Sequence, residues 1–148
     1  MSGTLARKAV DEGRRVWTVT RGLRPVPSGV TPIVVDRLKG AAFEEAIRGA
    51  DEEWDLIVDC ICYHPEVAQL DAELFLADDS LCDSFVLIST DFVYHPDTHR
   101  FPQDEAALRY LEDGYGYEKR RSELILSERA VHKRWTILPH CRWYPITV

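Results

Sequence analysis

The stretch "LIVDCIC" (residues 56–62) decides the fold, together with "FVLIST" (residues 85–90), which follows it after one predicted helix. Both stretches are short, rich in β-branched residues and almost continuously apolar, as strands are when both faces of their sheet are covered. Further strands are predicted at residues 16–20, 33–35 and 135–138. The sequence therefore predicts several short, buried strands.

Helical patterns separate these strands. They span residues 3–13, 41–50, 65–76 and 115–131. Strands that alternate with helices of this length imply right-handed crossovers and a parallel sheet. The predicted fold is therefore α/β, a doubly wound parallel sheet of the Rossmann-like class.

Composition narrows the class of protein. The chain has 148 residues, which suits one domain over residues 1–148, and its 45% hydrophobic and 29% charged residues are ordinary for a globular protein. A net charge of -7 argues against non-specific binding to nucleic acid, which depends on cations. No apolar run approaches the roughly 20 residues that span a bilayer, and no secretion signal is recognisable. We expect a cytoplasmic protein with no membrane segment and with reduced cysteines.

The stretch "YGYEKRRSE" (residues 115–123) carries the clearest chemical signal. Tyr115 and Lys119 lie four residues apart, so they share a helix face, and a nearby ammonium favours the phenolate of a tyrosine. The long polar stretch 94–114 before this helix is a candidate active-site loop, and it follows a strand that ends in Ser89 and Thr90. Ligands of parallel sheets bind at such strand ends. The alternative is that the pair belongs only to the solvated face of a charged helix.

The order of these motifs resembles a known family. "VLISTDFVYHP" (residues 86–96) followed by "YGYEKRRSE" is similar to the extended short-chain dehydrogenase/reductases, in particular the NAD-dependent epimerase/dehydratase group. The resemblance implies that Thr90 hydrogen-bonds the substrate oxygen and that Tyr115 is the general acid/base. It also implies that Lys119 binds the nicotinamide ribose and lowers the pKa of Tyr115. Phe92 stands where the sugar-nucleotide dehydratases have a glutamate, so redox chemistry or epimerisation is favoured over dehydration.

The resemblance also implies residues that bind NAD or NADP. Gly3 corresponds to the last part of a glycine-rich turn, and Asp36 to an aspartate that contacts adenine. Cys60 lies in the strand beside the cofactor. Arg21 stands where an acidic residue would favour NAD, so the expectation leans slightly to NADP. The alternative for each is an ordinary loop or strand-end residue.

The resemblance covers only the middle of the family's length. We expect the first strand and the C-terminal substrate domain to be missing, which would leave two strand edges without a partner. The predicted function is that of a fragment of an NAD(P)-dependent epimerase/dehydratase or reductase, acting on a sugar nucleotide or a similar small molecule and impaired in catalysis. The alternative is a non-catalytic nucleotide- or RNA-binding module, or a degenerate gene product. The glutamates of residues 118–134 argue against RNA.

Two further predictions concern a metal and a partner. Cys60, Cys62 and His64 alternate along the strand predicted at 56–62 and just beyond it, which would place them on one face. Buried cysteines usually pack as small hydrophobes, so no metal site is predicted. An apolar face along "SELILSERAV" (residues 122–131) could form a homodimer, although burial against the chain's own sheet is the simpler account.

Overall fold

The structure is a computed structural model that describes residues 2–98, 103, 109–130 and 134–140. The chain divides into two compact units, residues 1–53 and residues 54–148, and each is described by itself. The prediction of a single nucleotide-binding domain over residues 1–148 stays a prediction. Among the described residues, no helix combines the length and the apolar character needed to span a membrane.

The first unit contains one pair of parallel strands. β1 and β2 pair in register from Val16 opposite Val30 to Thr20 opposite Val34. The sequence predicted β2 to begin at residue 33, but it begins earlier and includes Pro32, which an edge strand tolerates because one side of its backbone needs no partner. The elements of this unit are α1 (Ser2–Asp11), β1 (Val16–Thr20), β2 (Val30–Val34) and α2 (Gly40–Arg48).

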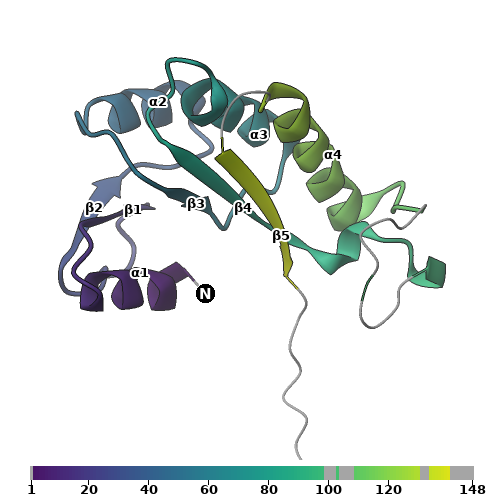
Figure 1. The fold of residues 1–148 in the computed structure, drawn as a ribbon, viewed down its shortest axis with the longest axis horizontal. Coiled ribbons are helices and arrows are strands. Elements are labelled where there is room, and N and C mark those ends of the chain that lie inside the picture. Colours follow the sequence, from purple (N-terminus) through teal and green to yellow (C-terminus); the bar gives the residue numbers. More distant parts are fainter. Residues whose placement is uncertain (1, 99–102, 104–108, 131–133, 141–148) are drawn as a thin grey trace, which may run out of the picture. The chain divides into compact units, whose positions relative to one another are not determined.

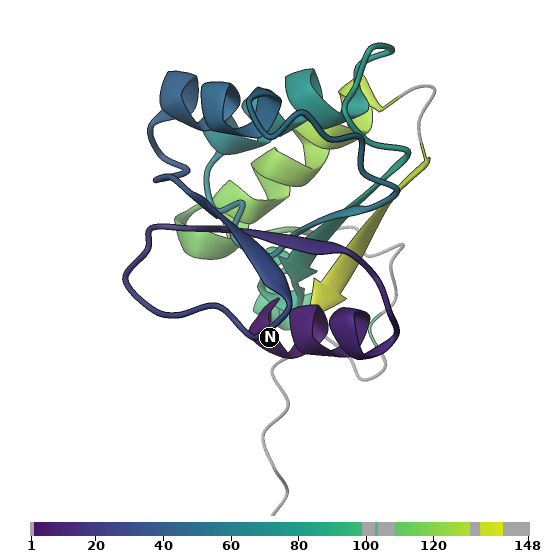
Figure 2. The same cartoon turned by 90° about the vertical axis from the view of Figure 1, so that its left-hand side faces the viewer.

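The second unit contains a parallel sheet with the strand order β3-β4-β5. Helices α3 and α4 contact each other and lie on the same side of β4 and β5 in both views (Figure 1 and Figure 2). The elements are β3 (Ile57–Asp59), α3 (Pro65–Asp71), a π-helical turn η1 (Ala72–Leu76), β4 (Ser84–Thr90), 3-10 turns η2 (Asp91–Val93) and η3 (Pro96–Thr98), α4 (Gly114–Arg129) and β5 (Arg134–His140). The predicted α/β class with parallel strands is confirmed.

The core of the second unit forms where the apolar faces of these elements meet. Phe85 on β4 stacks on Phe75 of η1 with ring centroids 6.0 Å apart. Leu87 on β4 and Leu126 on α4 are fully buried. Each such side chain contributes about 1.5–3 kcal/mol by leaving water, so this core fixes α4 to the sheet.

Strand β3 is shorter than the sequence predicted. It ends at Asp59, whose Oδ1 accepts a hydrogen bond from the backbone N–H of Ile61 at 2.7 Å. An aspartate that bonds two residues ahead turns the chain and ends the strand. The expected alternation of Cys60, Cys62 and His64 on one strand face is therefore wrong.

β1 and β3 are the strands expected to lack a neighbour on one side, and each has one paired edge. β1 pairs with β2 and β3 pairs with β4, and within the described residues neither has a second neighbour. The expectation of two unpartnered edges stays a prediction. Unpaired parallel edges expose backbone donors and acceptors that another strand can satisfy.

Candidate functional site

Thr90 ends β4 and begins the next turn. Its Oγ1 accepts a hydrogen bond from the backbone N–H of Phe92 at 3.2 Å and donates to Asp91 Oδ1 at 3.4 Å. The residue is 6% exposed. A threonine that caps the turn in this way directs the chain away from the sheet, so its hydroxyl stays at the carboxyl end of β4.

The N-terminal turn of α4 lies directly against this turn. Gly114 begins the helix with a φ of 69°, which favours glycine. Gly116 contacts the backbone of Phe92 so closely that a Cβ at this position would overlap the Phe92 carbonyl oxygen. A glycine at this position thus lets the start of α4, including Tyr115, approach the end of β4.

Lys119 is buried beneath the first turn of α4 and is only 1% exposed. Its Nζ donates hydrogen bonds to the carbonyl oxygens of Cys62 and Ile88, each at 2.9 Å. Ile88 lies in β4, and Cys62 lies just beyond the end of β3. The amine thus joins the carboxyl ends of two adjacent parallel strands. Burial lowers the pKa of Lys119, while the negative groups nearby, Cys62 and Asp59 foremost, act in the opposite direction.

Tyr115 is 52% exposed, and its ring lies 6.0 Å from that of Tyr63. Burial of its hydroxyl group raises the pKa of Tyr115, and Tyr63 raises it further. This direction is opposite to the lowering expected from Lys119.

These contacts bring the three predicted catalytic residues to one region. Lys119 bonds the carbonyl of Ile88, two residues before Thr90, and Gly116, the neighbour of Tyr115, packs against Phe92, two residues after Thr90. All three therefore surround the carboxyl end of β4. Their catalytic roles stay predictions.

The sequence did not single out Tyr63. Its ring faces Tyr115, and the Lys119 amine lies 5.7 Å from the ring centroid. Tyr63 directly follows Cys62, whose carbonyl oxygen accepts a hydrogen bond from the Lys119 amine. Only the folded geometry places this exposed aromatic ring beside the motif, because 51 residues of sequence separate it from Tyr115.

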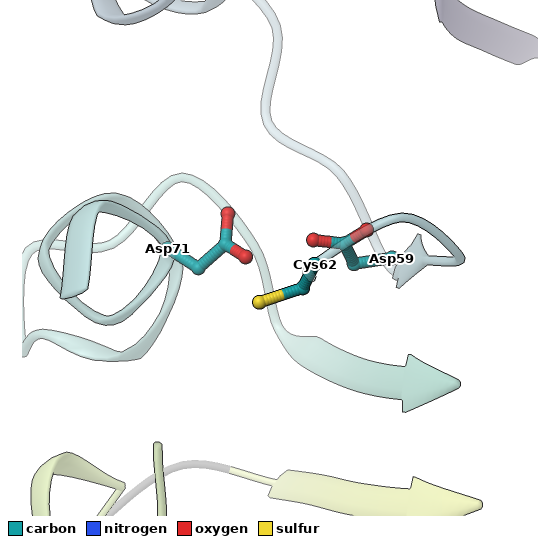
Figure 3. Close-up of side chains that lie close together, drawn as sticks. All are labelled: Asp59, Cys62 and Asp71. Atoms are coloured by element: carbon teal, nitrogen blue, oxygen red, sulfur yellow. The ribbon is translucent and has the colours of Figure 1, made fainter. Parts of the chain in front are cut away.

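A second cluster lies next to Lys119. The side chains of Asp59, Cys62 and Asp71 face one another (Figure 3), and their carboxylate and thiol ligand atoms lie within 4.8 Å of each other. All three are buried. Carboxylates and a thiolate are ligands for divalent cations. The positive charge of Lys119 already interacts with Asp59 and Cys62, so a metal ion at this cluster would compete with the lysine. The cluster shares only Cys62 with the trio considered from sequence.

The predicted cofactor residues are divided between the two units. In the first unit Arg21 follows β1 and is exposed, and Asp36 follows β2, with its Oδ1 accepting the backbone N–H of Leu38 at 3.0 Å. Because β1 and β2 are parallel, Arg21 and Asp36 lie at the same edge of that sheet. Gly3 lies in α1, where a Cβ would meet nothing within 4 Å.

Cys60 lies in the second unit, directly after β3, and is partly buried. Burial raises the pKa of Cys60, and Asp59 raises it further. Its thiol therefore stays protonated at neutral pH, as expected for a packing or contact residue. Its predicted place beside the cofactor is untested, as are those of Gly3, Arg21 and Asp36.

Solved structures show the same fold. The chain is similar to a proposed epimerase from Burkholderia cenocepacia J2315, with a TM-score of 0.77 and 18% identity over 94% of this chain and 50% of that one. It is also similar to a proposed NAD-dependent epimerase/dehydratase from Methylobacillus flagellatus, with a TM-score of 0.61 and 19% identity over 91% of this chain and 48% of that one. At these identities the likeness shows the fold alone, which is Rossmann-like. The chain spans about half the length of each.

No family model matches the chain, and no curated protein matches it. The resemblance inferred from the sequence motifs is thus supported only by the solved structures, and only at the level of the fold.

Proposed function

We propose that the chain is the nucleotide-binding part of an NAD(P)-dependent enzyme of the epimerase/dehydratase type, which acts on a sugar nucleotide or a similar small molecule. The observation that carries the proposal is the buried amine of Lys119, bonded to the carbonyls of Cys62 and Ile88 at the ends of β3 and β4. Ligands of parallel α/β sheets bind beyond these strand ends. The two similar solved structures have the same fold.

The residues at this edge fit a nicotinamide nucleotide. The exposed rings of Tyr63 and Tyr115 offer apolar surface for a planar ring. The Lys119 ammonium uses two of its three donors on carbonyls and is 1% exposed, so a ribose hydroxyl reaches the third only if the groups that cover it move. The cofactor, when bound, supplies the hydride acceptor or donor. Arg21, at the carboxyl edge of the first unit's sheet, supports a slight preference for NADP. Gly3, Asp36 and Cys60 are proposed as further cofactor contacts.

The three central residues have separate roles in the proposal. Thr90 offers a hydroxyl that can hydrogen-bond a substrate oxygen, and Tyr115 moves the substrate's hydroxyl proton. Tyr115 holds its proton at neutral pH, so in this proposal it donates that proton when a substrate carbonyl is reduced. Lys119 orients the ribose and, when charged, favours the phenolate.

A second candidate is a nucleotide-binding module without catalysis. The raised pKa of Tyr115 favours it, because a phenol that holds its proton is a poor base. RNA and a second copy of the chain remain less favoured partners, since the net charge is -7 and Leu126 on α4 is already buried.

Two measurements on one pair of variants separate these candidates. Fluorescence titration with NADH and NADPH measures binding, and chromatography of nucleotide sugars after incubation measures turnover, because epimerisation regenerates its cofactor and leaves the absorbance at 340 nm unchanged. Tyr115→Phe should retain binding and lose turnover. Tyr117 is an exposed tyrosine in the same helix, so Tyr117→Phe serves as the control and should retain both. Binding without turnover in the wild type would favour the module. Absence of binding to both nucleotides would exclude the proposal.

A further inference from the structure

Glu123 is a buried carboxylate on α4 with partners on two elements. Its Oε1 accepts a hydrogen bond from Ser89 Oγ on β4, and its Oε2 accepts one from Arg120 Nη1 at 2.8 Å. Glu123 and Ser89 are each 4% exposed. A buried carboxylate is tolerated when a cation and hydrogen-bond donors satisfy it, and here both oxygens are satisfied. The contact therefore fixes the position of α4 along β4.

Arg120 extends this contact to the segment that follows β4. Its guanidinium lies 4.0 Å from the centroid of the Tyr110 ring, which stacks on Tyr94 with centroids 5.6 Å apart. The backbone around Tyr94 and the backbone around Tyr110 are joined by a bridge between these two residues. They are also joined by the N–H of Leu111, which donates a hydrogen bond to the Val93 carbonyl at 2.9 Å. Arg120 on α4 thus contacts Tyr110, and Tyr110 in turn contacts Tyr94.

These residues flank the candidate site in the sequence. Ser89 precedes Thr90, Arg120 follows Lys119, and Glu123 lies one helical turn beyond Lys119. We propose that Glu123 and Arg120 are positioning residues, which fix the height of α4 on β4 and so hold Lys119 under the carbonyls of Cys62 and Ile88. The consequence for catalysis rests on the proposed function, but the positioning does not.

The same helix provides a matched control. Arg121 and Glu118 form an ion pair of the same residue types and the same three-residue spacing in the reverse order. The nitrogen and oxygen are 3.6 Å apart, and the side chains are 48% and 33% exposed. An exposed pair within one helix contributes about 0–1 kcal/mol and positions nothing on the sheet. Glu118→Gln and Arg121→Lys therefore test the effect of the substitutions themselves.

The first experiment measures access to Lys119 by trace acetylation and mass spectrometry, with the exposed Lys8 and Lys39 as internal references. Glu123→Gln and Ser89→Ala should each raise the relative labelling of Lys119 by about tenfold, because the helix opens locally more often. The double variant should exceed neither single variant by much, since the two groups share one interaction. Glu118→Gln should leave the ratio unchanged.

Lower thermal stability of Glu123→Gln with an unchanged labelling ratio would reduce Glu123 to a structural ion pair and overturn the proposal. Ser89→Ala gives the same test if Glu123→Gln does not fold. Labelling requires no nucleotide, so it remains decisive even if the chain binds neither NADH nor NADPH. Failure of the proposed function is thereby distinguished from failure of the positioning.

The second experiment tests Arg120 by hydrogen exchange. Arg120→Lys keeps the charge but loses the planar guanidinium that contacts both Tyr110 and Glu123. The amide of Leu111 should exchange about tenfold faster in this variant. Arg121→Lys should leave that amide protected, and equal protection in Arg120→Lys would contradict the positioning role.

Discussion

Gly116 on α4 lies so close to Phe92 that a Cβ at Gly116 would overlap the Phe92 carbonyl oxygen, with the Cδ1 of Leu111 only 2.7 Å away. The obstacle is a backbone atom, which cannot move as a side chain can. Gly116→Ala should therefore lower the free energy of unfolding by roughly 1–3 kcal/mol, although alanine favours a helix by about 1 kcal/mol over glycine. Denaturant titration measures the change.

Gly3→Ala is the matched control for this prediction. Gly3 also lies in a helix, but nothing lies within 4 Å of the added Cβ. The substitution should be neutral or stabilise the protein by a few tenths of a kcal/mol. If Gly116→Ala behaves like Gly3→Ala, α4 does not approach β4 as described.

Lys119→Met should destabilise the second unit. The variant keeps most of the side-chain volume but leaves the carbonyls of Cys62 and Ile88 without their donor, at a cost of about 2 kcal/mol. Lys39→Met, on an exposed residue, should change stability little. Chemical denaturation at pH 7.5 compares the two, and equal effects would contradict a structural role for the buried amine.

The cost of Lys119→Met should also depend on pH. Burial lowers the pKa of Lys119 below 10.5, so the unfolded chain binds more protons than the folded chain between the lowered pKa and 10.5. The wild type therefore gains stability as the pH rises through this window, and the variant lacks this gain. The difference in unfolding free energy between them should grow from pH 7.5 to pH 10. A constant difference would mean that the amine titrates normally.

Tyr115 should titrate above pH 10. Its pKa is raised by burial first and by Tyr63 second, so Tyr63→Phe should bring the pKa of Tyr115 closer to its ordinary value without restoring it fully. The raised pKa adds stability that is present below pH 10 and is lost as the pH rises through the folded value. The ¹³Cζ resonance of labelled tyrosine follows the titration. Tyr117→Phe should leave the Tyr115 titration unchanged.

Arg21 should influence the choice of cofactor. An exposed arginine at the end of β1 can pair with a 2′-phosphate, so Arg21→Asp should weaken NADPH binding more than NADH binding, by roughly tenfold for one charge contact. Arg24→Asp, in the same exposed loop, makes the same charge change nearby. Equal effects of the two variants would assign the preference to net charge rather than to Arg21.

The strands and helices were largely predictable, because apolar runs separated by helical periods dictate a parallel α/β arrangement. β4 and α4 begin within one residue of the predicted positions. β3 was predicted too long, since a buried aspartate inside an apolar run does not reveal from the sequence alone that it will bond ahead to Ile61. Pro32 obscured the start of β2 for a comparable reason, because the sequence does not show which strands are at an edge.

The candidate site was predictable only as far as its spacing. Tyr115 and Lys119 share one helix, so their proximity follows from the four-residue interval. The contacts of Lys119 with Cys62 and Ile88 join residues 57 and 31 positions away. Such contacts depend on strand order and helix packing, which no local pattern contains. The lowering of the Tyr115 pKa by Lys119 stays a prediction, because burial and Tyr63 together raise that pKa.

The most direct test of the account is to locate nucleotide binding by amide resonance shifts on the wild-type chain during titration with NADPH and NADH. Binding at the proposed site should shift the amides of Thr90, Tyr63 and the first turns of α4, including Tyr115 and Lys119, with little change at Arg129 at the far end of that helix. Shifts confined to other elements, or none at millimolar nucleotide, would contradict a nicotinamide-nucleotide site at the carboxyl ends of β3 and β4.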